Sequence, residues 1–215
     1  MSISSVCAQT GDKKQALIIH AGLSVPFSDF AGTSFGHLPG FAGNGMNAEA
    51  DYLKYVGRYF GLSLTTGYAN MDFREDAYRN EYRNILGQEG DIAIDAGNYQ
   101  LYRAMLGLAV RTPEFHNFEL LFILHLGYAC FIHPEIKVDF ADLGRINTVD
   151  KNVDPDNIKC YSFRLNYFLS EKYGINLTCN RNFAKPDFLD ETGIANHYIL
   201  PVQFQNINAG LVIRL

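Results

Sequence analysis

Hydrophobic and polar residues alternate with a period of two in eight separate stretches of the chain. In the stretch 118–132, for example, Leu120 and Phe122 lie on one face of an extended backbone and Glu119 lies on the other. This alternation predicts β-strands. The eight predicted strands are 15–26, 46–56, 59–70, 97–110, 118–132, 159–169, 173–183 and 202–215.

The connections between these strands alternate between short and long. The short ones lie near residues 57–58, 111–117 and 170–172, and the long ones span about 27–45, 71–96, 133–158 and 184–201. The long connections hold most of the Asp, Glu and Pro residues. Within the second long connection, the charge pattern from Arg74 to Leu86 predicts a short helix.

Two architectures fit eight alternating strands. A soluble barrel of the lipocalin type turns its apolar face inward, whereas a membrane barrel turns it outward to lipid and has a polar lumen. The polar face here is rich in Gly, Ser, Thr and Asn and has almost no Lys, which is typical of an enclosed lumen. Tyr and Phe recur near the strand ends, as at Phe60, Tyr68, Phe118 and Tyr128, where aromatic girdles lie. Alternating long loops and short turns also favour the membrane barrel.

Composition limits the alternatives. The chain has 215 residues, a formal net charge of −5, 47% hydrophobic residues and no Trp. It is too apolar to be disordered and lacks the basic character of a nucleic-acid binder. Its most apolar stretch, Leu120–Pro134, is 15 residues long, shorter than the about 20 that a transmembrane helix needs. The mean hydropathy of −0.08 is that of a soluble protein, but it also fits two unlike faces diluted by acidic loops.

The cysteines and the N-terminus carry little chemistry. Cys7, Cys130, Cys160 and Cys179 show no metal-binding spacing, so we expect neither a metal nor a cofactor. Small, uncharged residues fill the N-terminus, and Val6 and Ala8 stand at −3 and −1 to a cleavage position. We therefore interpret 1–14 as the remnant of a signal peptide and an N-terminal tail, and 15–215 as one barrel domain.

The chain resembles the small outer-membrane β-barrels of the porin family, in the OmpA/OmpX-like superfamily of Gram-negative envelopes. Ala21–Phe30 resembles their first strand and loop, Tyr59–Tyr68 their third strand and Ile207–Leu215 their last strand. The resemblance covers about 15–215 and implies an eight-stranded antiparallel up-and-down transmembrane β-barrel with short periplasmic turns and long extracellular loops. One departure is Leu215, since this family usually ends in an aromatic residue that the barrel-assembly machinery recognises.

The charged residues on the polar faces are the candidate site. An eight-stranded barrel is just wide enough for side chains to fill, and charges there must be paired. We expect Arg103 and Arg164 to neutralise Glu49, Asp51 and Glu119 in a structural network. The expected polar network of the lumen comprises His20, Glu49, Asp51, Arg103, Glu119, His125, Arg164 and Arg214. A proton or ion path through the same residues is the alternative.

Two further patterns indicate chemistry less clearly. The run Asp150-x-Asn152-x-Asp154-x-Asp156 resembles the start of a calcium loop, but Pro155 replaces the required Gly, so we reject an EF-hand and expect a solvated acidic loop. A loose surface site for divalent ions is the alternative. His133 and His197 fall near the outer rim, where some small barrels modify lipid headgroups, but no catalytic triad is recognisable.

We therefore expect a non-enzymatic outer-membrane barrel with a plugged polar lumen, serving envelope structure, surface binding or adhesion through long acidic loops. The expected partners are outer-membrane lipids, the barrel-assembly machinery and an extracellular ligand or envelope partner, with no nucleic acid. One alternative is a soluble, secreted, lipocalin-like barrel that binds a small apolar ligand. The other is a lipid-modifying barrel enzyme of the outer membrane.

Overall fold

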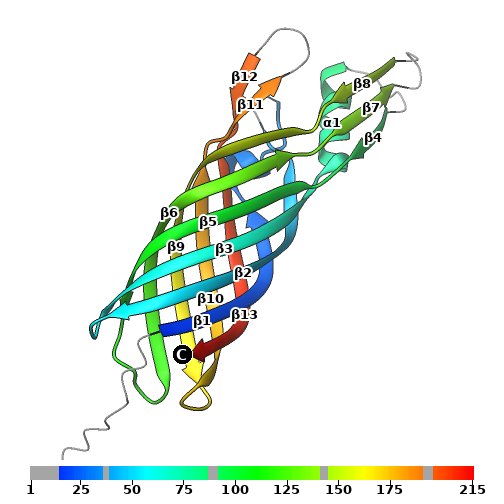
Figure 1. The fold of residues 1–215 in the computed structure, drawn as a ribbon. Coiled ribbons are helices and arrows are strands. Elements are labelled where there is room, and N and C mark those ends of the chain that lie inside the picture. Colours follow the sequence, from blue (N-terminus) through cyan, green and yellow to red (C-terminus); the bar gives the residue numbers. More distant parts are fainter. Residues whose placement is uncertain (1–14, 36–38, 87–91, 141–144, 191–195) are drawn as a thin grey trace, which may run out of the picture.

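Eight antiparallel strands close into a barrel in the order β1-β13-β10-β9-β6-β5-β3-β2 (Figure 1). The computed structural model describes residues 15–35, 39–86, 92–140, 145–190 and 196–215. The barrel strands are β1 (Gln15–Pro26), β2 (Ala42–Val56), β3 (Phe60–Phe73), β5 (Tyr99–Arg111), β6 (Phe118–His133), β9 (Asn152–Phe168), β10 (Tyr173–Ala184) and β13 (Val202–Arg214). All eight strands predicted from the alternation are confirmed, and so is the closed antiparallel barrel.

The strands reach further than predicted at the end with the long connections. β9 begins at Asn152 rather than near residue 159, and it passes through Pro155. Pro155 pairs with Cys130 of β6, whereas the pairing of β9 with β10 stops at Lys159. A proline is tolerated there because that edge of β9 has no β10 partner that needs an N–H donor.

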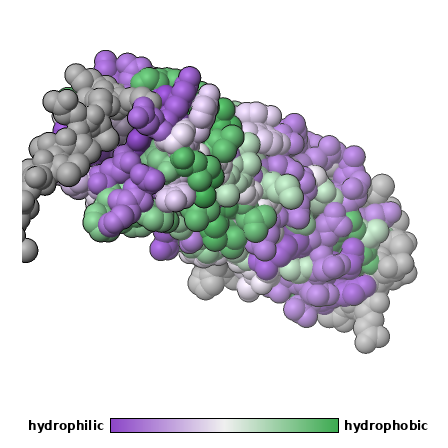
Figure 2. Space-filling model, turned by 90° about the horizontal axis from the view of Figure 1, so that it is seen from below, coloured by the Kyte–Doolittle hydropathy of each residue, from purple (hydrophilic) through white to green (hydrophobic). Residues whose placement is uncertain are grey.

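Apolar side chains cover the outside of the barrel. Leu106, Leu108 and Leu126 are 69%, 66% and 64% exposed, whereas their sequence neighbours Met105 and His125 are buried inside the barrel, at 1% and 2%. On the face in Figure 2, hydrophobic side chains gather over the middle of the barrel, with hydrophilic ones towards both ends. A lipocalin-like barrel has the opposite arrangement, so that alternative is wrong. This outward apolar face is the one that a membrane barrel presents to lipid.

The two ends of the barrel differ (Figure 1). At the turn end, tight connections join β2 to β3, β5 to β6 and β9 to β10, and the C-terminus lies there. At the other end, which we call the outer end, further elements extend the chain beyond the barrel. They are η1 (Ser28–Ala31), α1 (Glu75–Leu86), β4 (Ile92–Ala96), β7 (Ile136–Phe140), β8 (Arg145–Val149), β11 (Asp187–Asp190) and β12 (Asn196–Ile199).

The outer-end elements form small sheets of their own. β4, β7 and β8 make a three-stranded antiparallel sheet, and β11 pairs with β12. Helix α1 confirms the prediction made for this charged segment. No helix in the described ranges is long and apolar enough to cross a membrane. The expected signal-peptide remnant, 1–14 with Cys7, lies outside the described residues.

Candidate functional site

The barrel interior has three layers along its axis. A polar centre, built by His20, Glu49, Asp51, Thr65, Arg103, His125, Arg164, Asn180, Asn206 and Asn208, is buried between two apolar layers. The turn-end layer consists of Ala16, Ile18, Leu53, Tyr55, Ala109, Leu121, Ile123, Phe168 and Val212. The outer layer includes Met71, Leu101, Phe131, Ile158 and Phe204. Interior positions alternate with lipid-facing ones, so every second residue of each strand points into the barrel. Successive inward residues of a strand contribute to successive heights along the axis.

Glu49 connects opposite walls of the barrel. It projects inward from β2 and its Oε1 lies 2.5 Å from Nη2 of Arg103 on β5. The side-chain amides of Asn206 and Asn208 on β13 each donate to Oε1 at 2.9 Å. Asn180 on β10 donates to Oε2 at 2.9 Å. One carboxylate thus receives four donors from three other strands, and it is 3% exposed.

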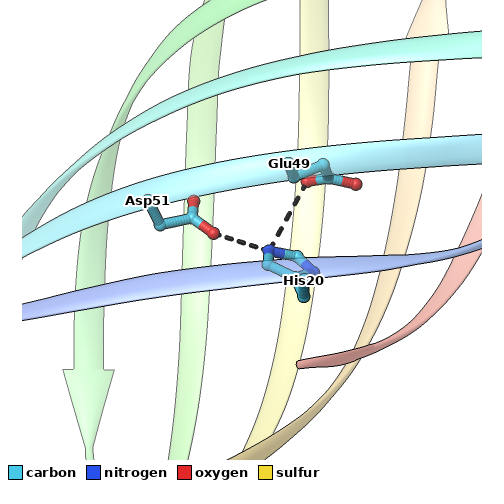
Figure 3. Close-up of side chains that lie close together, drawn as sticks. All are labelled: His20, Glu49 and Asp51. Carbon is cyan, nitrogen blue, oxygen red and sulfur yellow. Dashed lines mark hydrogen bonds and ion pairs between the residues drawn. The ribbon is translucent and has the colours of Figure 1, made fainter. Parts of the chain in front are cut away.

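Asp51 is the second centre of charge. Figure 3 shows His20 of β1 pointing between the two acids of β2, with its Nε2 2.7 Å from Oδ2 of Asp51 and 4.0 Å from Glu49. Nη2 of Arg164 on β9 pairs with Oδ1 of Asp51 at 2.8 Å, and Thr65 of β3 donates to the same oxygen. Both expected arginines thus neutralise acids of β2, and the structure assigns Arg103 to Glu49 and Arg164 to Asp51.

The same residues contain a possible metal-ligand set. One ligand atom from each of His20, Glu49 and Asp51 lies within 4.8 Å of the others. However, Arg103 and Arg164 already balance the two carboxylates, and each carboxylate accepts several further hydrogen bonds. A divalent cation would add two charges to a balanced, fully buried cluster, which is costly. The residues therefore fit an ion-pair network and do not fit a metal centre.

Glu119 has a different cationic partner from the two arginines expected. It lies near the turn end, 3.1 Å from Nη1 of Arg111, and it accepts hydrogen bonds from Tyr55 at 3.1 Å and from Asn166 at 3.0 Å. The register explains the difference, because Glu119 pairs with Asn166, two residues along β9 from Arg164. The expectation that Arg103 or Arg164 would neutralise Glu119 is wrong.

Arg214 also stands apart from the polar centre. Its guanidinium lies over the ring of Phe168 at the turn end and pairs with Glu114 in the connection between β5 and β6. Its side chain is 16% exposed. The other seven expected residues are buried inside the barrel, but Arg214 closes its turn end rather than joining the central network.

Asparagines of the barrel interior were not singled out from the sequence. Asn166, Asn176, Asn180, Asn206 and Asn208 all face inward and are 2% exposed or less. The asparagines of β10 and β13 recur on the inward faces of their strands. This spacing could have identified them in the sequence as members of the polar interior. His125 completes the polar centre, with Nε2 3.2 Å from Ser63 Oγ and 3.1 Å from Thr65 Oγ1.

His133 packs into the outer layer. It lies beyond Tyr128, the last exposed aromatic side chain of β6, and therefore above the lipid-facing band. Its ring packs against Tyr99 and Phe188, and Nδ1 lies 2.8 Å from the carbonyl oxygen of Pro134. Burial lowers the pKa of His133 to about 4, although the hydrogen bond to Pro134 opposes the shift. The side chain of His197 lies outside the described residues.

The acidic run that resembles a calcium loop has a structural role. Oδ2 of Asp154 accepts the backbone N–H of Asp187, and Oδ2 of Asp156 accepts that of Lys185, both at 2.8 Å. The two carboxylates thus hold the segment that leads into β11 against the part of β9 that pairs with β6 but not with β10. The expected solvated acidic loop is wrong for Asn152, Asp154 and Asp156, because these residues belong to β9, whereas Asp150 lies outside the strand and is exposed.

The comparisons agree with this architecture. Neisserial surface protein A (NspA) has a TM-score of 0.50 at 9% identity, with 94% of this chain and 97% of that chain covered. A major outer membrane protein from Thermus thermophilus has a TM-score of 0.51 at 11% identity, with 94% and 99% covered. The chain has the fold of the small eight-stranded outer-membrane β-barrels. No protein-family model and no curated protein matches its sequence.

Proposed function

We propose that this chain is a non-conducting β-barrel of a Gram-negative outer membrane that presents its outer end as a binding surface, for adhesion or for contact with an envelope partner. Two structural neighbours are described as a surface protein and as an outer membrane protein, which supports this location. Contact with outer-membrane lipids and insertion by the barrel-assembly machinery are part of the proposal.

The burial of the barrel interior carries the proposal. Asp51 and Arg164 in the polar centre are 0% exposed, as are Ile18 and Val212 in the turn-end layer and Phe204 in the outer layer. A continuous water channel would expose the side chains that line it. Eight strands leave room only for side chains, whereas open pores have about 16 strands. The barrel therefore serves as an anchor.

The outer end supports a binding role because it is packed. Tyr78 of α1 makes edge contacts with Phe35, Phe41 and Phe73, with ring centroids 4.9 to 5.4 Å apart. The same hydrophobic cluster continues into β4 and β7. A fixed surface loses less conformational entropy on binding than flexible loops do. The solvent side carries exposed acids on several elements: Asp72, Asp76, Asp95, Asp139 and Asp150.

The proposal includes no catalytic step. His133, the described histidine nearest to the role of a headgroup catalyst, is packed between aromatic rings and is 7% exposed. Its contact with the ring of Phe188 and its burial leave little of the imidazole open to a lipid headgroup.

Conductance tests the plugged lumen. Purified protein reconstituted into planar lipid bilayers should give no steady channels, whereas an open porin in parallel should give them. Reproducible unitary conductance of the wild-type protein at moderate voltage would overturn the proposal.

Cysteine labelling tests the orientation. In a cysteine-free background, Ala93→Cys on β4 should react with a membrane-impermeant maleimide in intact cells. Pro113→Cys at the turn end should react only after the outer membrane is permeabilised. Both positions are exposed in the folded chain. The reverse pattern, or equal labelling in intact cells, would contradict the orientation.

A further inference from the structure

Three cations gather on the outside of the barrel near its outer end. We call Lys159, Arg181 and Lys185 the basic cluster; all three are exposed. Lys159 on β9 pairs across the sheet with Phe183 on β10, and the other two lie two residues to either side of Phe183. Arg181 is thus the diagonal neighbour of Lys159, a position about 7–8 Å away in an antiparallel pair.

The basic cluster has no anionic partner of its own. In the described part of the chain, none of its members makes an ion pair. The residues opposite them in register are neutral, namely Leu126 beside Lys159, and Tyr161 and Gln205 beside Arg181. The nearby acid Asp156 accepts the backbone N–H of Lys185. A chain with a net charge of −5 thus carries three cations without an ion-pair partner on its outer wall.

Aromatic rings place this patch at the border of the lipid-facing band. The guanidinium carbon of Arg181 lies 4.4 Å from the ring centroid of Phe27 and 5.4 Å from that of Phe183. Phe183 also contacts Tyr161, with centroids 5.8 Å apart, and Tyr161 is 49% exposed. Aromatic residues on the outside of a barrel mark the level of the lipid headgroups. The cations therefore lie at the depth of phosphate groups.

We infer that the basic cluster binds the phosphate of an anionic lipid in the leaflet that surrounds the outer end. Arg donates paired hydrogen bonds to phosphate, and Lys adds point charges that attract it. Below the cluster, towards the turn end, Phe163 and Ile207 are both 55% exposed and offer an apolar wall to the acyl chains. This inference rests on the membrane location given under the proposed function.

Cations at the turn end provide a contrast. Lys54, Arg58 and Lys172 are also exposed, and two of them stack on neighbouring tyrosines. Lys172 lies apart from the other two, because β1 and β13 separate β2 from β10 in the barrel. The three therefore form a matched control with the same number of charges that do not gather around one position.

The experiment titrates lipid onto the full chain folded in a non-ionic detergent. The probes are diphosphorylated lipid A, the same lipid without phosphates, and inorganic phosphate, with bound lipid counted by native mass spectrometry. The cluster variant is Lys159→Gln/Arg181→Gln/Lys185→Gln, and the control variant is Lys54→Gln/Arg58→Gln/Lys172→Gln. Each cation near a membrane surface contributes roughly fivefold to binding, so the cluster variant should bind about a hundredfold more weakly. Heat-modifiable mobility on gels checks folding, and Lys159→Gln alone is used if the triple variant does not fold.

Wild type and the control variant should bind the phosphorylated lipid with equal affinity. The affinity of wild type for the dephosphorylated lipid should be as low as that of the cluster variant for the phosphorylated lipid. Unchanged binding by the cluster variant, or equal weakening in both triple variants, would overturn the inference. Equal competition by inorganic phosphate would assign the site to a free anion and overturn the lipid assignment. Because detergent micelles impose no orientation, these results are independent of the labelling test of the proposed function.

Discussion

Replacing Glu49 with Gln should remove much of the stability of the barrel. The substitution keeps the shape of the side chain but removes the charge opposite Arg103, whose side chain is 2% exposed. It also places an amide NH₂ at one of two positions that both receive donors, from Asn180 at one and from Asn206 and Asn208 at the other. Arg103 then keeps a hydrogen bond to Asn182 but has no carboxylate to balance its charge.

The magnitude follows from burial. Removing one partner of a buried ion pair costs roughly 3–5 kcal/mol, because the other charge remains unpaired away from water. The matched control is Glu114→Gln, which makes the same chemical change in the pair with Arg214 at the turn end. That pair is partly exposed, at 30% for Glu114 and 16% for Arg214. Pairs open to solvent contribute below about 1 kcal/mol.

Urea unfolding in lipid vesicles, followed by the gel mobility of folded and unfolded protein, measures both losses; the absence of Trp makes tyrosine fluorescence a second readout. A double variant, Glu49→Gln/Arg103→Met, removes both charges and should recover part of the loss. The ion pair does not hold the barrel together if Glu49→Gln costs no more than Glu114→Gln. The same conclusion follows if the double variant loses, relative to wild type, the sum of the losses of Glu49→Gln and Arg103→Met.

Three further predictions test other contacts. Gly107→Val should lower the free energy of unfolding by roughly 1–3 kcal/mol through overpacking, because a Cβ there would lie 2.5 Å from Cδ2 of His125. The control Ala104→Val, on the lipid face, should be nearly neutral. Equal unfolding midpoints for the two variants would contradict this prediction. Asp156→Ala should speed limited proteolysis after the end of β10 without changing barrel unfolding, and unchanged cleavage would argue against the docking role. Between pH 6.5 and 4 the unfolded chain binds a proton that folded His133 rejects, so acidification should destabilise the outer layer by up to roughly 3 kcal/mol. Limited proteolysis of the outer-end elements should therefore become faster as the pH falls over this range. In His133→Gln this acceleration should disappear, and its persistence would refute the assignment.

The strands could be predicted because their signal is local. Leu120 faces lipid and its neighbour Glu119 faces the interior. Each strand shows this alternation of apolar and polar residues by itself, whichever strands it pairs with. The direction of the two faces also follows from composition, since an interior of Asn, Thr and Ser with scarce charges fits a small closed lumen. The extension of β9 was missed because Pro155 and its flanking acids have the composition of a loop. Only its one-sided pairing with β6 makes a strand possible there.

The partners inside the lumen depend on register, which the sequence pattern leaves open. Phase alone places Glu49, Asp51 and Glu119 inside, but which arginine meets each acid is decided by the stagger between strands. That stagger sets Glu119 beside Asn166 and within reach of Arg111 at the turn end. The inward-facing asparagines follow from the same need to balance charge. If every strand supplied a cation, the interior would carry more positive charge than its two central carboxylates could balance. Neutral amides therefore donate the remaining hydrogen bonds, which satisfies the acids without adding charge.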